Sequence, residues 1–144
     1  MKLDKIIIDF INEHHVLTLA TSNENKPHAC NCFYAFDIQD IVLICTSDTK
    51  TKHISDVLKN NFVAGSIVLE TTKIGKIQGI QFYGYMFPAQ NEKLEKYKKI
   101  YLKRFPFAVL KNSQLWYITL TYIKMTDNRL GFGKKLIWKK ETSK

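Results

Sequence analysis

The fold is decided by residues 15–37, whose sequence is HVLTLATSNENKPHACNCFYAFD. Apolar and polar side chains alternate in both arms of this stretch, and residues 23–27 between them favour a turn. This period of two predicts strands over residues 15–22 and 28–37, joined by that turn. Residues 41–46 follow after a short connection and are apolar enough for a strand buried on both faces. Three consecutive strands with short connections predict an antiparallel meander.

Outside this meander, the sequence predicts three amphipathic helices and four further strands. The expected helices are residues 3–14, 51–60 and 92–105, and the expected strands are residues 62–70, 76–88, 115–126 and 134–140. In the second helix, Ile54, Val57 and Leu58 form the expected apolar face. Six or seven strands with few helices predict a mainly β fold, a small β-barrel with helical decoration. An open α+β sheet is harder to reconcile with so many long strands.

The length of 144 residues predicts a single domain that spans residues 1–144. This length excludes a doubly wound dinucleotide-binding enzyme with a separate substrate domain, but it allows a cofactor site shared between two subunits. The net charge of +9, from 22 basic and 13 acidic residues, is unevenly distributed. Residues 1–48 carry −4, whereas residues 49–144 carry +13. A basic half is typical of proteins that bind nucleic acid, an anionic membrane or a phosphorylated ligand, although a solvated Lys-rich surface has the same composition.

Other features of the composition narrow these partners. Only Arg104 and Arg129 are arginines, so repeated bidentate contacts to bases are not expected and nucleic-acid binding is disfavoured. No apolar run approaches the ~20 residues that span a bilayer, so no membrane segment is predicted. The three cysteines, Cys30, Cys32 and Cys45, are an odd number, and no signal-peptide pattern precedes them. We therefore expect a cytoplasmic protein with reduced thiols.

His28, Cys30 and Cys32 alternate along the second predicted strand and so point to one of its faces. At ~3.3 Å per residue, His28 and Cys32 lie about 13 Å apart on a straight strand. Ligand atoms lie only ~2.0–2.3 Å from zinc, so one ion cannot bind both ends of this set without a bend. Two small cysteines that pack in a barrel core explain the pattern, and no metal is expected. The spacing assigns no catalytic residue either.

The strongest chemical signal is in residues 46–53, TSDTKTKH, where a strand ends and a helix begins. The first turn of a helix presents unpaired N–H groups and a positive dipole end, and here hydroxyl and ammonium groups are close to it. This combination favours a phosphate site, although a Thr49 or Thr51 that only caps the helix gives the same pattern. The GFGKK sequence at residues 131–135 fits neither common nucleotide-binding glycine motif and is predicted to be a tight turn.

Short distinctive segments are spread over nearly the whole chain. They are HVLTLAT at 15–21, NCFY at 31–34, KTKH at 50–53, VAG at 63–65, GIQF at 79–82, RFP at 104–106, KMTDN at 124–128 and LGFGKK at 130–135. Together these segments resemble the FMN-binding split-barrel superfamily of the pyridoxamine 5'-phosphate oxidases, and in particular an uncharacterised bacterial branch of it.

The resemblance implies a six-stranded antiparallel split barrel that forms a homodimer, with FMN in two clefts at the subunit interface. On this basis the flavin ring lies along the strand that contains Cys30, Asn31, Cys32 and Phe33. The resemblance places the flavin phosphate at Thr46, Ser47, Lys50, Thr51, Lys52 and His53. From the partner subunit it implies contacts by Gln81, Trp116, Lys135 and Trp138.

The sequence departs from the oxidases at two places. The Arg that reaches the flavin phosphate from the second strand is replaced by Cys30 or a neighbour, and residues 128–133 replace the C-terminal Arg/His pattern for the substrate phosphate. Pyridoxamine phosphate oxidase activity is therefore not expected, and haem or a deazaflavin are alternative cofactors. We hypothesise a flavin-dependent oxidoreductase or flavin reductase that acts on a small molecule. The alternatives are a non-catalytic protein that binds or senses a flavin or related cofactor and, less favoured, a basic nucleic-acid-binding domain.

Overall fold

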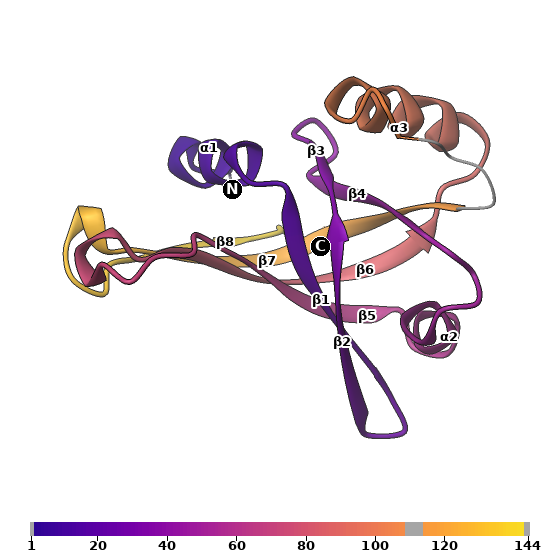
Figure 1. The fold of residues 1–144 in the computed structure, drawn as a ribbon, viewed down its shortest axis with the longest axis horizontal. Coiled ribbons are helices and arrows are strands. Elements are labelled where there is room, and N and C mark those ends of the chain that lie inside the picture. The colour runs from indigo at the N-terminus through magenta and orange to yellow at the C-terminus, as the bar shows by residue number, and fades with distance from the viewer. Residues whose placement is uncertain (1, 109–113, 143–144) are drawn as a thin grey trace.

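The chain folds into one curled antiparallel sheet with three α-helices around it, as a computed structural model shows for residues 2–108 and 114–142 (Figure 1). The helices are α1 (Lys5–Glu13), α2 (Lys52–Lys59) and α3 (Asn91–Arg104), with two 3-10 turns, η1 (Ile74–Lys76) and η2 (Asn128–Leu130). The strands are β1 (Val16–Asn23), β2 (Lys26–Phe33), β3 (Ala35–Asp37), β4 (Val42–Ser47), β5 (Phe62–Val68), β6 (Gln78–Pro88), β7 (Gln114–Asp127) and β8 (Lys135–Lys139). The mainly β class and the three predicted helices are confirmed, while the described strands number eight rather than six or seven.

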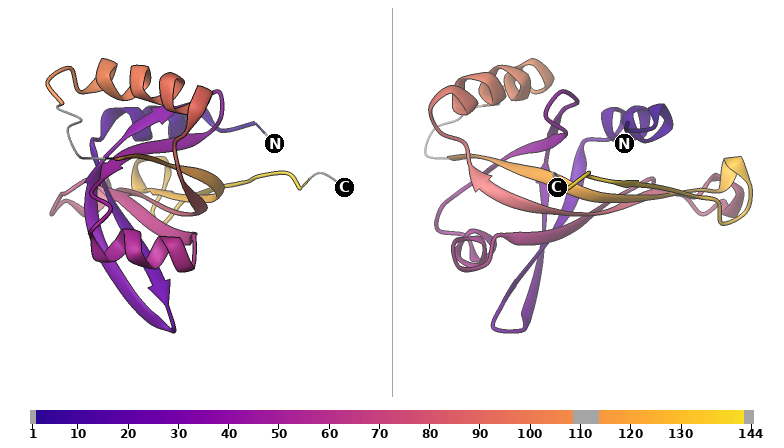
Figure 2. Two further views of the ribbon diagram at one scale, coloured as in Figure 1. Left: turned by 90° about the vertical axis from the view of Figure 1, so that its right-hand side faces the viewer. Right: turned by 180° about the vertical axis from the view of Figure 1, so that it is seen from behind.

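The strands pair in the order β2-β1-β5-β6-β7-β4-β3, and β8 pairs with the second half of β7. The sheet curls until β2 contacts β4, and Figure 2 shows the curvature of the sheet from two further sides. No ladder of hydrogen bonds joins β2 to β4 in the described part of the chain, so the barrel is split between these two strands. The predicted split-barrel architecture is therefore confirmed.

The strand predicted over residues 28–37 is interrupted at Tyr34, which separates β2 from β3. The Tyr34 side chain is completely buried, and its hydroxyl donates to the carbonyl oxygen of Ile11 in α1 at 2.6 Å. Its backbone N–H donates to the carbonyl oxygen of His15 at 3.0 Å. Beyond this residue the chain leaves β1 and pairs with β4 instead. The break at Tyr34 thus lets the chain pass directly from β2 on one side of the split to β3, which pairs with β4 on the other side.

The turn between β1 and β2 is shorter than the predicted span of residues 23–27. Only Glu24 and Asn25 lie between the strands, and both have positive φ angles, 52° and 61°. A two-residue turn of this handedness matches the right-handed twist of a hairpin. It sets the register in which Leu19 lies opposite Cys30 and Thr18 opposite Asn31.

The core fills the inside of the curl, where α1 covers it with Ile7, Phe10 and Ile11. A second, smaller cluster lies where Tyr97 and Tyr101 of α3 pack against the other face of β4. Both faces of β4 are therefore buried, as its sequence predicts. None of the helices in the described ranges combines the length and the hydrophobicity that a membrane crossing requires.

The buried face of α2 differs from the predicted one at Leu58, which is 71% exposed. Ile54 and Val57 are buried as expected, but the third buried residue is Asp56. The hydroxyl of Thr21 in β1 donates to Asp56 Oδ2 at 2.9 Å, which compensates the burial of this carboxylate. The helix is therefore rotated toward Asp56 and away from Leu58. A hydrophobic pattern does not contain this information, because the buried group is charged.

Gly84 in β6 provides a test of the packing inside the sheet. It lies where the register between β6 and β7 shifts, and a Cβ atom there would be 2.5 Å from the carbonyl oxygen of Thr119. Because that neighbour is backbone, the strand itself would have to move. We expect Gly84→Ala to lower the free energy of unfolding by about 1–3 kcal/mol, measured by urea denaturation. Gly75→Ala is the matched control, since no atom lies within 4 Å of its added Cβ, and equal losses in both variants would refute this explanation.

Candidate functional site

β2 lies at the edge of the ladder, and its side chains alternate between the two faces of the sheet. Cys30 and Cys32 point to the inner face, where they pack with the barrel core. Asn31 points to the outer face, where its side-chain oxygen accepts a hydrogen bond from Thr18 Oγ1 at 2.9 Å. Phe33 is also on the outer face and is 61% exposed. The residues predicted to line the flavin ring are therefore divided between two faces.

On the inner face, the thiols of β2 meet a histidine from the first turn of α2. The Sγ atoms of Cys30 and Cys32 and a ring nitrogen of His53 all lie within 4.8 Å of one another. A hydrogen bond of 2.9 Å between Ser47 Oγ and His53 Nε2 holds the imidazole at the end of β4. Cys45, also on β4, is fully buried and belongs to the same core cluster as Cys32. We call Cys30, Cys32 and His53 the inner cluster.

The spacing along β2 places His28 too far from Cys32 for both to bind one ion. The same spacing does not indicate that His53 lies beside the two cysteines. β3, β4 and a turn separate the inner-cluster cysteines from α2 in the sequence. The curl of the sheet brings the start of α2 against β2. The local sequence indicates only that two thiols on one face of a strand would need a third metal ligand from another segment. The spacing does not identify that segment.

Burial and mutual contacts set the protonation of the inner cluster. The hydrogen bond with Cys32, together with burial, raises the pKa of the Cys30 thiol far above its ordinary value. For Cys32, the hydrogen bond with Cys30 lowers the pKa, but the hydrogen bond with Cys45 and burial outweigh it and raise the pKa to about 12. Burial and the nearby His28 lower the pKa of His53. At neutral pH both thiols are therefore protonated and the imidazole is neutral.

The turn between β4 and α2 retains part of its predicted capacity for an anion. Lys52 forms an ion pair with the buried carboxylate of Asp56, one helical turn away. Lys50 is exposed, and no acidic side chain in residues 2–108 or 114–142 forms an ion pair with it. Thr51 occupies the N-cap position of α2 but makes no side-chain capping bond. Lys50 and the first-turn N–H groups of α2 are therefore the available donors of this turn.

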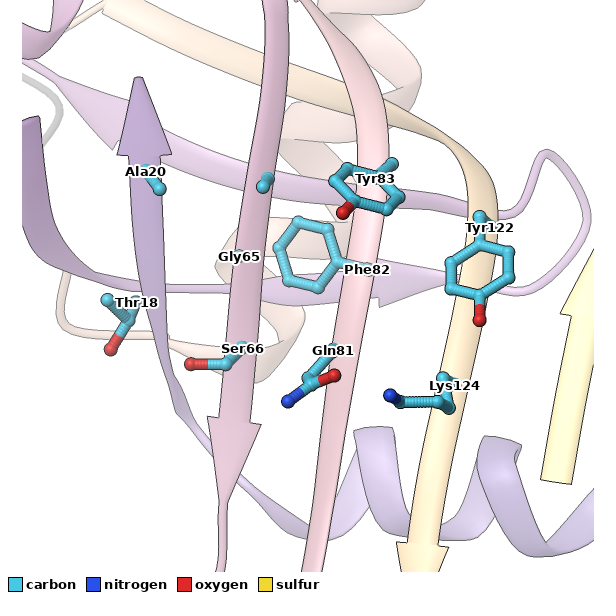
Figure 3. Close-up of a pocket in the computed structure, with 10 residues that line it drawn as sticks. Thr18, Ala20, Gly65, Ser66, Gln81, Phe82, Tyr83, Tyr122 and Lys124 are labelled. Carbon is cyan, nitrogen blue, oxygen red and sulfur yellow. The ribbon is translucent and has the colours of Figure 1, made fainter. Parts of the chain in front are cut away.

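The outer face carries a row of polar side chains that crosses neighbouring strands from β2 to β7. The register of the ladders places these residues directly opposite one another, in the order Asn31, Thr18, Ser66, Gln81 and Lys124. Figure 3 shows four of them, from Thr18 to Lys124, side by side on their strands. We call these five residues the polar row. Gln81, which the resemblance implies as a cofactor contact, is one of its members.

A second row runs beside the polar row, with three alanines followed by two tyrosines. Its members, in order across the strands, are Ala29, Ala20, Ala64, Tyr83 and Tyr122. The alanines leave a flat floor, and the rings of the two tyrosines, with centroids 5.7 Å apart, rise at one side of it (Figure 3). Members of both rows from β1 to β7 line a shallow hollow of about 370 Å³. The outer face thus offers an apolar floor with a hydrogen-bonding edge.

The other residues implied by the resemblance lie elsewhere. Trp116 and Trp138 are in the barrel core, with exposed fractions of 2% and 3%. Lys135 in β8 donates from Nζ to Thr126 Oγ1 at 2.8 Å. Thr46 is directed toward α3, where its hydroxyl oxygen lies 3.5 Å from that of a tyrosine. The two tryptophans therefore contribute to the core of their own subunit.

Solved structures share this fold at sequence identities that establish the fold alone. A FAD-binding protein from Mesorhizobium loti superposes with a TM-score of 0.66 at 14% identity, covering 85% of this chain and 94% of the other. A candidate pyridoxamine 5'-phosphate oxidase from Listeria innocua gives 0.66 at 15% identity, covering 83% and 94%. A haem-binding protein from Mycobacterium smegmatis gives 0.74 at 13% identity, and there the chain covers 90% of its own length but 55% of the other. The fold is the split barrel of pyridoxamine phosphate oxidase-like proteins.

Sequence comparison assigns the chain to a family. It is 36% identical over 136 residues to the UPF0306 protein plu4501 of Photorhabdus laumondii, covering 94% of this chain and 95% of the relative. It is 37% identical over 134 residues to a UPF0306 protein of Serratia proteamaculans, covering 92% of each. The chain therefore belongs to the UPF0306 family. No protein-family model matches the sequence.

The buried carboxylate of Asp56 makes the free energy of unfolding depend on pH in a way that can be measured. Hydrogen bonding from Lys52 lowers the pKa of Asp56 below its ordinary value of 3.8. The stability that its charged form contributes is thus complete above the ordinary pKa and is lost as the pH falls through the folded-state pKa. We expect Asp56→Asn to lower the free energy of unfolding near pH 7, and the difference from the natural protein to shrink below about pH 4.

Urea denaturation over this pH range measures the effect. Asp9→Asn, which removes an exposed carboxylate paired with Lys5, is the matched control and should change stability little at any pH. A difference between Asp56→Asn and the natural protein that stays constant down to about pH 3 would contradict the role of this charge.

Proposed function

We propose that this protein is a homodimeric flavin-binding protein that acts as a flavin-dependent oxidoreductase or flavin reductase on a small molecule. The observation that carries the proposal is the polar row beside its alanine floor. A flat ring system with hydrogen-bonding groups along one edge, as in isoalloxazine, would pack on such a floor and meet the amide, hydroxyl and ammonium groups of the row. The shared fold of a FAD-binding protein, at a TM-score of 0.66, supports this assignment.

The turn before α2 fits the phosphate group of FMN. An exposed ammonium group at Lys50 and the first-turn N–H groups of α2 are the donors that a phosphate requires. α2 packs against β1 and β2 on the inner side of the sheet, through contacts such as the bond from Thr21 to Asp56. The polar row is on the outer side. One flavin that used both features would take them from different subunits, which supports cofactor clefts at a homodimer interface.

A bound flavin would supply the electron transfer, and the residues of the chain would bind and orient it. Gln81 offers both a donor and an acceptor to the polar edge of a ring. Lys124, at the end of the row, would stabilise negative charge that develops on a reduced ring. Tyr83 and Tyr122 would cover one side of a ring bound in the hollow.

A second candidate, a binding or sensing protein without turnover, is favoured by the lining of the same hollow. Its titratable residues are Tyr83, Tyr122 and Lys124, and neither histidine nor carboxylate is among its described lining residues. General acid–base catalysis most often uses histidine or a carboxylate, and neither of these groups is among the described lining residues. Anaerobic addition of NADPH to FMN-loaded protein separates the candidates. Bleaching of the flavin band supports the reductase, whereas an oxidised band that persists supports the binder.

The cofactor class is tested separately from turnover. Haem-binding as well as flavin-binding proteins share this fold. Titration with FMN, with a deazaflavin and with haemin, each followed by its visible spectrum, identifies which cofactor binds with saturation. If only haemin binds with saturation, the cofactor is haem and the flavin proposal is wrong.

Lys50→Ala tests the phosphate site. We expect this substitution to weaken FMN binding by about 1.5–3 kcal/mol, because a charge-assisted hydrogen bond to the phosphate is lost. Calorimetric titration measures the affinity. Riboflavin has the same ring without a phosphate and should bind the natural protein and the variant equally. Lys59→Ala, at the opposite end of α2, is the matched control. An unchanged FMN affinity in Lys50→Ala would contradict a phosphate site at this turn.

Exposed aromatic side chains on β5 and β6 support the homodimer. Phe62, Tyr83, Tyr85 and Phe87 have exposed fractions of 44%, 48%, 42% and 37%. Ring centroids lie 5.8 Å apart between Phe62 and Tyr83 and 5.1 Å apart between Phe62 and Tyr85, so these three rings form one patch. Aromatic patches of this kind mark protein–protein interfaces.

Tyr85→Asp tests the dimer, because Tyr85 belongs to this patch but does not line the hollow. We expect the natural protein to sediment as a dimer and Tyr85→Asp as a monomer, since the charge would be buried in the interface without a partner. Ile38→Asp is the matched control, an exposed apolar residue in the β3–β4 turn that should leave the dimer intact. A natural protein that sediments as a monomer, or dissociation in both variants, would contradict this interface.

A further inference from the structure

The inner cluster has chemistry that the proposed flavin site does not use. The flavin proposal draws on the outer face and on Lys50, whereas Cys30, Cys32 and His53 lie on the inner face at the split of the barrel. We propose that these three residues bind a zinc ion. This site is independent of whether the outer face binds a flavin.

The distances in the inner cluster fit a single ion. Its two sulfur atoms and one ring nitrogen lie within 4.8 Å of one another. Ligand atoms at ~2.0–2.3 Å from a tetrahedral zinc ion are separated by about 3.5 Å, so small side-chain rotations bring all three to bonding distance. Cys30 and Cys32 are on one face of the same strand, and the sheet holds their separation. His53 approaches from a different element, which gives the ligands three directions instead of one line.

The donor set selects the class of metal. Binding of the ion would release the protons of the two thiols to solvent, and the resulting two thiolates and one imidazole are soft and borderline ligands that favour zinc over the hard ions magnesium and calcium. The nearby carboxylate of Asp56 is engaged by Lys52 and Thr21 and is not a member of the cluster. Oxygen ligands, which the hard ions require, are therefore not supplied by a free carboxylate at this site.

The surroundings of the cluster resemble the support that metal ligands receive in proteins. Ser47 Oγ forms a hydrogen bond of 2.9 Å with Nε2 of His53, so this hydroxyl orients the imidazole. Cys45 packs beside Cys32 from the core side. Cys30 and His53 are half-buried, which leaves access for the ion and a fourth position for water or a small ligand.

The site is tested by metal titration of the reduced, metal-free protein without added flavin. Zinc affinity is measured by competition with a chromophoric chelator, and Co²⁺ is used as a spectroscopic substitute. We expect one zinc ion per chain and a thiolate-to-cobalt charge-transfer band with tetrahedral ligand-field bands. Magnesium should not compete with zinc at comparable concentrations.

Variants assign the ligands. We expect Cys30→Ser, Cys32→Ser and His53→Gln each to weaken zinc by more than about 100-fold, beyond the 10–100-fold that removal of a supporting group costs. His28→Gln is the matched control that removes a nearby imidazole outside the cluster, and it should keep the affinity within about 10-fold. Circular dichroism establishes that each variant is folded.

Two results would overturn the metal site. One is a zinc affinity that is the same in the natural protein and in folded Cys32→Ser and His53→Gln. The other is a cobalt complex without a thiolate band. Because no flavin is present in these titrations, either failure leaves the flavin proposal to its own test.

Discussion

The alternation of side chains along β2, at the edge where the barrel is split, is the constraint on which both candidate sites depend. Neighbouring residues of a strand cannot share a face, so Cys30 and Cys32 enter the barrel while Asn31 joins the polar row outside it. A register shift of one residue would exchange the two sets and place both thiols in solvent. The two-residue turn at Glu24 and Asn25 sets that register, and with it the position of both sites.

α2 contacts both sides of the split, β1 through Asp56 and the end of β4 through His53. Its Asp56 is bonded to Thr21 of β1 and to Lys52, so the helix is fixed against the inner face of the sheet. Because Lys52 is engaged in this way, Lys50 is the cation that remains open to an anion at the helix N-terminus. The same orientation of α2 directs His53 toward the thiols of β2. One buried carboxylate thus determines which groups face the split and which face solvent.

The sequence predicts the strands and helices well because their periodicity is local, and the resemblance predicts the split barrel and a bacterial family within it. What depends on contacts between distant segments is missed. Tyr34 ends β2 because its hydroxyl bonds to α1, and Leu58 is exposed because Asp56 takes the buried place. The polar row and the inner cluster join residues from separate elements, so they depend on ladder register and on the curl of the sheet. Neither property is present in the spacing of a single segment.

The proposed flavin site combines the outer face of one subunit with the α2 turn of its partner. The most direct test is the visible absorption spectrum of the pure protein during titration with FMN. We expect a shifted and better resolved flavin band that saturates at one FMN per chain, together with sedimentation of the complex as a dimer. A spectrum that remains the sum of the spectra of free FMN and protein at micromolar concentrations would contradict a flavin site in this protein.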